Sequence, residues 1–207
     1  MNTILVVDDN LDVVEVFVEM LQQGGYHLLV AFSGEECLDI LKTETPDLIL
    51  LDIMMKPMDG WETLEKITEG LTTSLIPVLM LTSKQITPAE MEKYGNHIED
   101  YVLKPVTVFE LCNAVEHVLH RQHNIQFDVI RAMQGEVDFG VVNEYAHLSK
   151  SIDINKRFLN LFETRYNLNN SIIDASDTYC QALKQLDSTI RFQKTRLQQI
   201  SEQIKIS

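Results

Sequence analysis

Five short apolar segments alternate with five helix-forming segments in the first 120 residues, and this alternation constrains the fold more than any other feature. The apolar segments are residues 4–7, 27–31, 48–51, 77–81 and 98–103. The segments between them, which have a helical spacing of apolar residues, are 11–23, 33–42, 59–69, 87–94 and 106–120. Strict alternation of this kind is typical of α/β proteins, so we predict a doubly wound sheet of five parallel strands.

The third apolar segment runs directly into a carboxylate. Residues 48–51 are apolar on both faces, which is typical of a central strand covered by helices on either side, and Asp52 follows. An isolated charge beside a core is costly, so Asp52 is either a cap or turn residue or part of a site. Ligands of such sheets bind at the carboxyl ends of the strands, where we also expect Asp8, Asp9, Thr82 and Lys104.

This set of side chains favours phosphoryl chemistry. Three carboxylates that lie together repel one another unless one is protonated or a cation is bound. Ligands that are all oxygen favour Mg²⁺ over zinc. Asp52 can then attack phosphorus as a nucleophile, while the metal and Lys104 neutralise the charge of the transferring group and Thr82 donates a hydrogen bond to it.

Five sequence motifs, in this order, carry a resemblance to a known family. They are "VVDDN", "LILLDIMM", "MDGWE", "VLMLTSK" and "DYVLKP". Together they resemble the receiver domain of two-component response regulators over residues 1 to about 120, with wording similar to receivers of methanogenic archaea. The resemblance implies a flavodoxin-like strand order and an aspartate, here Asp52, that accepts a phosphoryl group from a sensor histidine kinase.

The same resemblance implies roles for individual residues. Asp8 and Asp9 match the metal-binding acidic pair, and Asp52 and the backbone carbonyl of Met54 complete the Mg²⁺ contacts. The remaining matches are Lys104 as the phosphate-binding lysine, Thr82 and Tyr101 as the switch pair, and Ser83 as the small residue beside the threonine.

One position departs from the family's pattern. The family commonly has proline four residues after the phosphorylated aspartate, whereas this chain has Lys56 there and Pro57 next. We expect an altered loop beside the site but retained chemistry, because no ligand is lost.

Charge divides the chain near residue 120. Residues 1–120 carry 21 acidic and 6 basic residues, a net charge of −15, and residues 121–207 carry 10 and 11, a net charge of +1. An excess of acid this large disfavours nucleic acid and anionic membrane as direct ligands of the first half. We therefore predict a domain at 1–122, a helical connector at 123–140 and a second domain at 141–207.

Nothing in the sequence suggests a membrane or an export signal. No apolar run approaches the roughly 18 residues of a membrane span, and the start "MNTILVVDDN" lacks a basic segment. The three cysteines are widely spaced and odd in number, which is typical of reduced packing residues. We expect a cytoplasmic protein.

The second domain has the pattern of an all-α antiparallel hairpin. Apolar or bulky residues recur at alternating steps of four and three, which defines a heptad seam along each helix. The seam positions are Val141, Tyr145, Leu148, Ile152, Asn155, Leu159, Phe162 and Tyr166, then Ile172, Ser176, Tyr179, Leu183, Leu186, Ile190, Gln193, Leu197, Ile200 and Ile204.

The hairpin has apolar residues that its own seam does not explain. Ile154, Phe158 and Leu161 widen the apolar face of the first helix, so we predict a homodimer that forms a four-helix bundle, or a hairpin that binds a partner helix. Asn155 and Gln193 either set register or partner choice, or lie at a solvated edge; the sequence leaves both open.

These features predict a Mg²⁺-dependent response regulator that switches a helical output and dimerisation domain. It is a signalling phosphoacceptor rather than an enzyme, apart from its own phosphorylation and dephosphorylation. One alternative is a DNA-binding transcriptional regulator, although the cluster Arg191, Lys194 and Arg196 is more typical of a solvated helix face. Another is a phosphorelay intermediate that uses His147, with Lys150 three residues on.

Overall fold

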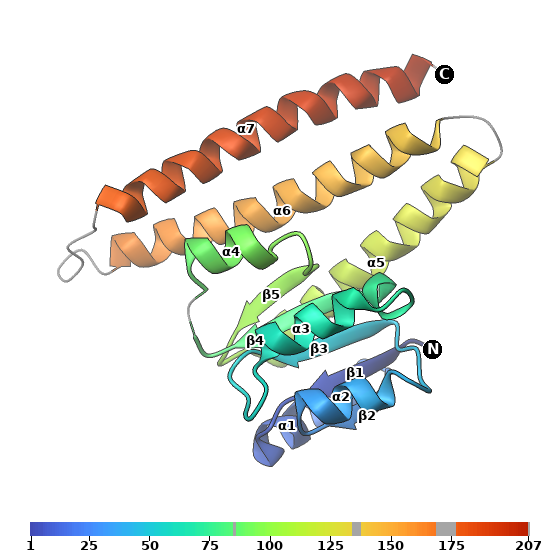
Figure 1. The fold of residues 1–207 in the computed structure, drawn as a ribbon, viewed down its shortest axis with the longest axis vertical. Coiled ribbons are helices and arrows are strands. Elements are labelled where there is room, and N and C mark those ends of the chain that lie inside the picture. Colours follow the sequence, from blue (N-terminus) through green and yellow to red (C-terminus); the bar gives the residue numbers. More distant parts are fainter. Residues whose placement is uncertain (85, 134–137, 169–176, 207) are drawn as a thin grey trace. The chain divides into compact units, whose positions relative to one another are not determined.

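The computed structural model describes residues 1–84, 86–133, 138–168 and 177–206. Strands and helices alternate through the first 120 residues, and long helices follow (Figure 1). The elements are β1 (Thr3–Val7), α1 (Leu11–Gln23), β2 (His27–Ala31), α2 (Gly34–Ile40), β3 (Leu48–Asp52), α3 (Gly60–Glu69), η1 (Thr73–Leu75), β4 (Val78–Thr82), α4 (Pro88–Tyr94), β5 (Asp100–Leu103), α5 (Val108–Met133), α6 (Phe139–Leu168) and α7 (Asp177–Ile206).

The sheet has the predicted topology. All four neighbouring pairs are parallel, and the strand order is β2-β1-β3-β4-β5. The order reverses beside β1, which is the switch point where such sheets bind ligands. The α/β fold with flavodoxin-like order is therefore confirmed, and the carboxyl ends of β1 and β3 lie next to each other.

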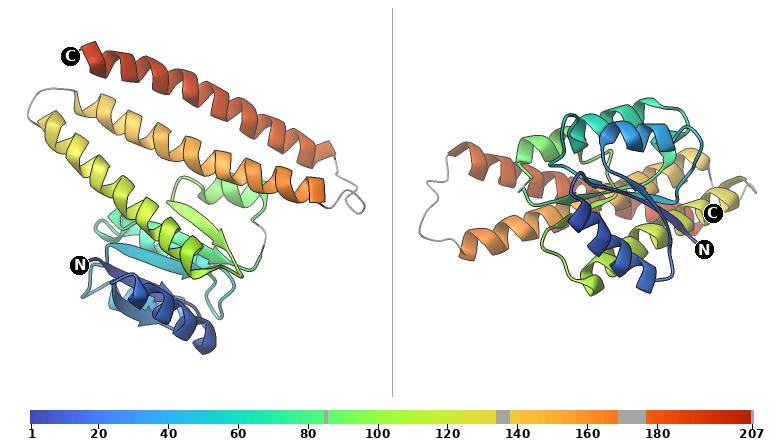
Figure 2. Two further views of the ribbon diagram at one scale, coloured as in Figure 1. Left: turned by 180° about the vertical axis from the view of Figure 1, so that it is seen from behind. Right: turned by 90° about the horizontal axis from the view of Figure 1, so that it is seen from below.

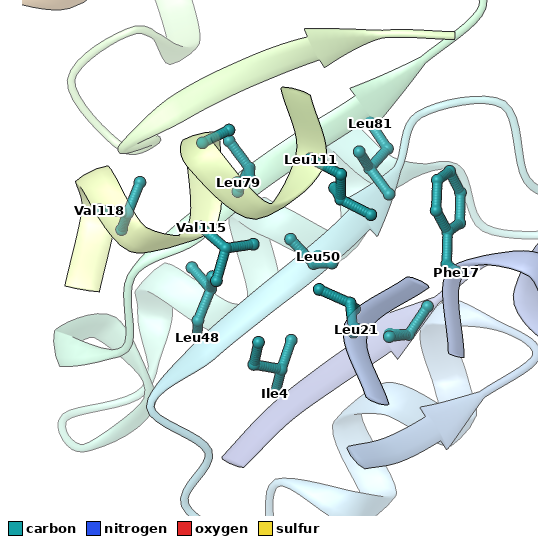
Figure 3. Close-up of a cluster of buried hydrophobic side chains, with 12 residues drawn as sticks. Ile4, Phe17, Leu21, Leu48, Leu50, Leu79, Leu81, Leu111, Val115 and Val118 are labelled. Carbon is teal, nitrogen blue, oxygen red and sulfur yellow. The ribbon is translucent and has the colours of Figure 1, made fainter. Parts of the chain in front are cut away.

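Helices cover both faces of this sheet. Alternate residues of the central strands pack with α1 and α5 on one face (Figure 3), and α2 and α3 lie on the opposite face (Figure 2). The buried cluster on the α1/α5 face is Ile4, Val6, Phe17, Leu21, Leu48, Leu50, Leu79, Leu81, Leu111, Ala114, Val115 and Val118. Burial on both faces explains why β3 and β4 read as unbroken apolar runs.

Side-chain caps fix where the helices begin. Thr87 accepts a hydrogen bond from the Glu90 amide at 3.2 Å, and the Glu90 carboxylate accepts one from the Thr87 amide at 2.8 Å. This is a complete capping box at the start of α4. Ser33 and Asp59 cap α2 and α3 through the amides three residues on.

The chain forms two compact units. The sheet unit comprises Met1–Ile86 and Asn96–Gln122, and the helical unit comprises Thr87–Gly95 and His123–Ser207. Helix α5 contributes its first part to the sheet unit and its last part to the helical unit, and α4 groups with α6 and α7. Helix α5 itself is continuous from Val108 to Met133, and the division between the two units falls after Gln122.

Within the helical unit, α6 and α7 form an antiparallel hairpin. Gln193 bonds to Ser151 at 2.9 Å, while Arg196, three residues further along α7, bonds to Glu144, earlier on α6, at 2.7 and 2.9 Å. Partner numbers fall on α6 as they rise on α7, which is the signature of antiparallel packing. The hairpin prediction is confirmed.

The described positions of the predicted seam are buried or partly buried. On α7, Leu183, Leu186, Gln193 and Leu197 are partly buried, and Ile190 and Ile200 are almost fully buried. On α6, the seam positions 141, 145, 148, 155 and 159 are partly buried and Ile152 is buried. Six further seam positions, whose side chains lie outside the described part of the chain, are Phe162, Tyr166, Ile172, Ser176, Tyr179 and Ile204.

The two polar seam residues meet at one point. Gln193 and Asn155 both donate to the hydroxyl oxygen of Ser151, at 2.9 and 3.3 Å. The side-chain oxygen of Gln193 is buried and has no hydrogen-bond partner among the described residues. Of the two open readings, this geometry favours a polar contact that sets the register of the hairpin.

Two of the residues that prompted the dimer prediction are already covered. Ile154 and Phe158 are 2% and 1% exposed in the single chain, and Leu161 lies outside the described side chains. Ile154 and Phe158 therefore offer no exposed apolar surface to a second copy, and the homodimer stays a prediction. None of the described helices is long and apolar enough to cross a bilayer.

A largely buried ion pair ties the part of α5 that belongs to the sheet unit to the residue before β5. Arg121 donates to the backbone carbonyl of Glu99 at 3.1 Å and to its carboxylate at 3.3 Å, and it contacts the Nδ1 atom of His117 at 3.2 Å. The Arg121 and Glu99 side chains are 14% and 7% exposed. This contact lies at the junction where α5 leaves the sheet unit.

We predict that Arg121→Met lowers the free energy of unfolding of the sheet unit by about 3 kcal/mol, because it removes the guanidinium from beside the buried Glu99 carboxylate. Lys42→Met is the control, since it breaks an exposed pair with Asp39 in the same unit and should cost less than about 1 kcal/mol. Urea unfolding followed by Trp61 fluorescence measures both. Equal losses for the two variants would contradict the prediction.

We predict that Gln193→Leu raises the stability of the helical unit by about 1 kcal/mol, because it removes a buried acceptor that makes no hydrogen bond. Asn155 and Ser151 keep their own bond in this variant. Gln198→Leu, on the exposed side of α7, is the control and should change stability little. Thermal unfolding by circular dichroism would show the difference, and a clear loss of stability in Gln193→Leu would refute it.

Candidate functional site

Three buried polar side chains lie at the carboxyl edge of the sheet. Asp8 follows β1, Asp52 ends β3 and Thr82 ends β4, and they are 2%, 3% and 0% exposed. The strands that carry them are neighbours in the order β1-β3-β4. The alternation of apolar runs and polar strand ends in the sequence therefore translates into one cluster, as expected.

Lys104 joins two of these carboxylates. Its ammonium donates to Asp52 Oδ1 at 2.5 Å and to Asp8 Oδ2, and its nitrogen lies 5.5 Å from the centre of the Phe17 ring. A cation over an aromatic face is attracted by the ring's quadrupole. The ammonium thus offsets the mutual repulsion of two buried acids, and Phe17 supports it from the core (Figure 3 shows Phe17 near the end of β4).

Asp52 is held by the main chain as well as by Lys104. Its second oxygen accepts a hydrogen bond from the Met54 amide at 2.5 Å. Gly60 packs directly behind it: a Cβ atom at residue 60 would lie 2.1 Å from the Asp52 carbonyl oxygen and 2.7 Å from the Ile53 Cα. Only glycine allows the start of α3 to approach the strand end this closely.

Burial raises the pKa of Asp52 above its ordinary value. The hydrogen bond and charge of Lys104 act in the opposite direction, and the charge of Asp8 adds to the rise. Desolvation is the largest of these causes, so a proton is bound more tightly at Asp52 in the folded chain than in the unfolded chain.

The two acids after β1 are held differently. Asp8 accepts a hydrogen bond from the Asn10 amide at 2.9 Å, and Asn10 in turn caps α1. Asp9 is exposed and accepts a hydrogen bond from the Lys56 amide at 3.2 Å, across 47 residues of sequence. The loop that follows β3 is therefore tied to the end of β1.

The ligand atoms at this edge are of the type that a hard divalent cation prefers. Asp8, Asp9 and Asp52 supply only oxygen, which Mg²⁺ prefers. In the part of the chain that the structure describes, no group of three or more acidic, histidine or cysteine side chains is arranged to hold a metal ion. Lys104 already binds one oxygen each of Asp8 and Asp52, while Asp9 keeps one oxygen that accepts from no described residue.

The two residues of the implied switch lie on one face of neighbouring strands. Met80 pairs with Tyr101 and Thr82 with Leu103, so Tyr101 and Thr82 are diagonal neighbours. The Thr82 hydroxyl donates to the Lys84 carbonyl at 3.0 Å and accepts from the Lys84 amide at 2.9 Å. It is thus engaged with the loop that leads to α4, and the Tyr101 side chain is buried.

Three contributors to this site have no role in the prediction from sequence. Gly60 stands in the quoted motif "MDGWE", but its approach to Asp52 follows only from the packing of α3. Phe17 has the spacing of any core residue of α1. Lys56 attracted notice only as a departure from a pattern, and its backbone amide, not its side chain, touches the site.

The other sequence candidates lie in the helical unit. His147 is exposed on α6, and Lys150 is half-buried. Of the three cations that raised the question of DNA, Arg191 pairs with Asp187 at 2.8 Å and Arg196 with Glu144 at 2.7 Å. Two of the three are thus neutralised by acids of the same unit, which disfavours contact with phosphate.

Comparison with family models divides the chain into two parts. Residues 4–116 match the model of the response regulator receiver domain, and residues 121–207 match a model described as "Metanogen output domain 2". The first match covers more than half of the chain and includes every residue of the cluster described above.

Solved structures and curated proteins agree with the first match. A domain of a response regulator receiver protein from Methanoculleus marisnigri is 60% identical (57% of this chain, 97% of that one, TM-score 0.50). The response regulator TrrA of Thermotoga maritima, in complex with Mg²⁺ and BeF, is 30% identical (57% and 99%, TM-score 0.52). The transcriptional regulatory protein CpxR of Escherichia coli is 34% identical over 59% of this chain, which spans about half (51%) of its length.

We predict that Asp52→Asn is more stable than the natural chain at neutral pH and that this advantage disappears in acid. Because the folded-state pKa of Asp52 is raised, its contribution to stability is present below the ordinary carboxyl pKa and is lost as the pH rises through the raised value. Asparagine has no proton to lose. Urea unfolding from about pH 3 to pH 7 measures the difference. A variant that is less stable throughout that range would contradict the prediction.

Proposed function

Because this chain belongs to the response regulator receiver family, we propose that it accepts a phosphoryl group on Asp52 from a sensor histidine kinase and uses it to switch the helical unit. The observation that carries the proposal is the ion pair between Lys104 and Asp52 at the carboxyl edge of the sheet, with Asp8 on the same ammonium. The family match supports a signalling phosphoacceptor rather than an enzyme with an external substrate.

The transfer requires an ionised Asp52. An oxygen of its carboxylate forms the bond to phosphorus, the bond from phosphorus to the donor's imidazole nitrogen breaks, and the electron pair stays on that nitrogen, which takes up a proton. Lys104 favours the ionised acid and remains beside the new acyl phosphate, where its charge offsets that of the phosphoryl oxygens.

We further propose that Asp8, Asp9, Asp52 and the Met54 carbonyl hold Mg²⁺. The ion would neutralise the charge of the phosphoryl group. Most of the catalysis of such transfers depends on this neutralisation. The oxygen-only donor set supports this assignment, and so does the Mg²⁺–BeF complex of the TrrA relative. Within the chain, the Met54 amide keeps Asp52 oriented while the ligands assemble.

Thr82 links the site to the output. A phosphoryl group adds about −1.5 to −2 charge and three acceptor oxygens, which favours a hydrogen bond from the Thr82 hydroxyl. That hydroxyl must first leave the Lys84 backbone, so the loop before α4 changes when Thr82 changes partner. Helix α4 groups with α6 and α7 in the helical unit, which supports this loop as the route to the output. Tyr101 is the second member of the proposed switch.

The kind of output that the helical unit provides rests on a second set of observations. Residues 121–207 match a model whose description names an output domain, and several relatives of the first part are named transcriptional regulators. Because Arg191 and Arg196 are paired within the helical unit, we propose that the output is a protein contact, through a partner helix or a second copy, in the cytoplasm.

We predict that Asp52→Asn abolishes Mg²⁺-dependent phosphorylation of the full chain by acetyl phosphate, because an amide cannot form the acyl phosphate. Asp47→Asn, at the other end of β3, is the matched control and should be phosphorylated normally. Intact mass and phosphate-affinity gels measure the product, and removal of Mg²⁺ with EDTA should stop the reaction in both the natural chain and the control. Undiminished labelling of Asp52→Asn would refute the proposal.

A further inference from the structure

We propose that the backbone amide of Lys56 is a positioning group for Asp9 and increases the affinity of the site for Mg²⁺. The amide donates to Asp9 Oδ2 at 3.2 Å and connects the loop after β3 to the end of β1. The inference rests on the proposed function, in which Asp9 is a ligand of the cation, and it adds a group that holds this ligand.

Asp9 is the acid of the cluster that most needs such a group. Asp8 and Asp52 are buried and held from two sides, by Lys104 together with the Asn10 or Met54 amide. Asp9 is exposed, and the Lys56 amide is its hydrogen-bond donor among the described residues. An exposed side chain loses rotamer freedom when it binds a ligand, and a bond that already restricts it lowers that entropic cost.

The hydrogen bond uses only one of the two carboxylate oxygens of Asp9. The amide occupies Oδ2, and Oδ1 accepts from no residue that the structure describes. A carboxylate with one oxygen on a main-chain donor and the other directed to a metal is a ligand oriented by an outer hydrogen bond. Loss of such bonds typically reduces metal affinity by about 10- to 100-fold.

The residue at position 56 determines whether this donor exists. Proline has no N–H, so a proline four residues after Asp52 would leave Asp9 without the bond. This chain has Lys56 there and Pro57 one position later. The departure from the family's common pattern is therefore a gain of one hydrogen-bond donor at the site, and the lysine side chain itself, which is exposed, is not required for it.

The test compares Lys56→Pro with Lys56→Ala in the full chain. Both variants lose the lysine side chain, and only the first loses the amide. Mg²⁺ is titrated alone, with Trp61, the single tryptophan, as fluorescent reporter and with isothermal calorimetry as a second readout. We expect the dissociation constant for Mg²⁺ to be about tenfold higher in Lys56→Pro than in Lys56→Ala. Equal constants in the two folded variants would overturn the inference.

Asp9→Ala separates this inference from the proposal on which it rests. If Asp9→Ala leaves Mg²⁺ affinity unchanged, Asp9 is not a ligand and the metal assignment itself fails. If Asp9→Ala weakens binding but the Lys56 variants are equal, only the role of the amide fails. If Lys56→Pro does not fold, NMR tests the hydrogen bond between the Lys56 amide and Asp9. The signal of the Lys56 amide proton should move upfield in Asp9→Ala and should not move in the control Asp12→Ala. Equal shifts in the two variants would refute the contact.

Discussion

The contact between the Lys104 ammonium and the carboxylates of Asp8 and Asp52 is the interaction on which the site depends. Two acids that are 2% and 3% exposed lie at adjacent strand ends, where their charges repel and neither is well hydrated. The compensating cation comes from the far side of β4, since Lys104 follows β5. Its nitrogen lies 5.5 Å from the centre of the Phe17 ring.

The same contact also bears on how the proposed phosphorylation would act. Lys104 favours the ionised form of Asp52, whose pKa is raised by desolvation. A new anionic group on Asp52 would change what the ammonium and the Thr82 hydroxyl bind. Thr82 has two bonds to the Lys84 backbone to exchange, and the residues that follow lead into α4, which is part of the helical unit.

The spacing of apolar residues predicted the strands, the helices and the heptad seams well, but it did not predict which segments cover the apolar residues. The heptad positions Ile190 and Ile200 are buried because a repeat of 3.5 residues keeps them on one stripe of α7. The off-seam residues Ile154 and Phe158 suggested a missing partner, yet the single chain buries them. A pattern shows that a residue is apolar, and only the three-dimensional path of the chain shows which other segment packs over it.

Polar contacts depended on tertiary structure to a greater degree. The sequence left Asn155 and Gln193 with two interpretations, and the antiparallel register that brings both to Ser151 distinguishes them. Gly60 and Lys56 act through the main chain, so their side-chain identities said little about their contacts with Asp52 and Asp9. Backbone donors are present at almost every position, and only folding selects the few that matter.

By itself, the sequence determined the order of strands and helices, the acids and lysine of the site and the heptad stripes, because these follow from local periodicity and from the rule that parallel strands end at one edge. The tertiary structure alone decided that Lys104 bridges Asp8 and Asp52, that Thr82 bonds to Lys84 and that the Lys56 amide reaches Asp9. These contacts join residues through loop conformation and side-chain rotamers, which depend on the packed surroundings and not on local sequence.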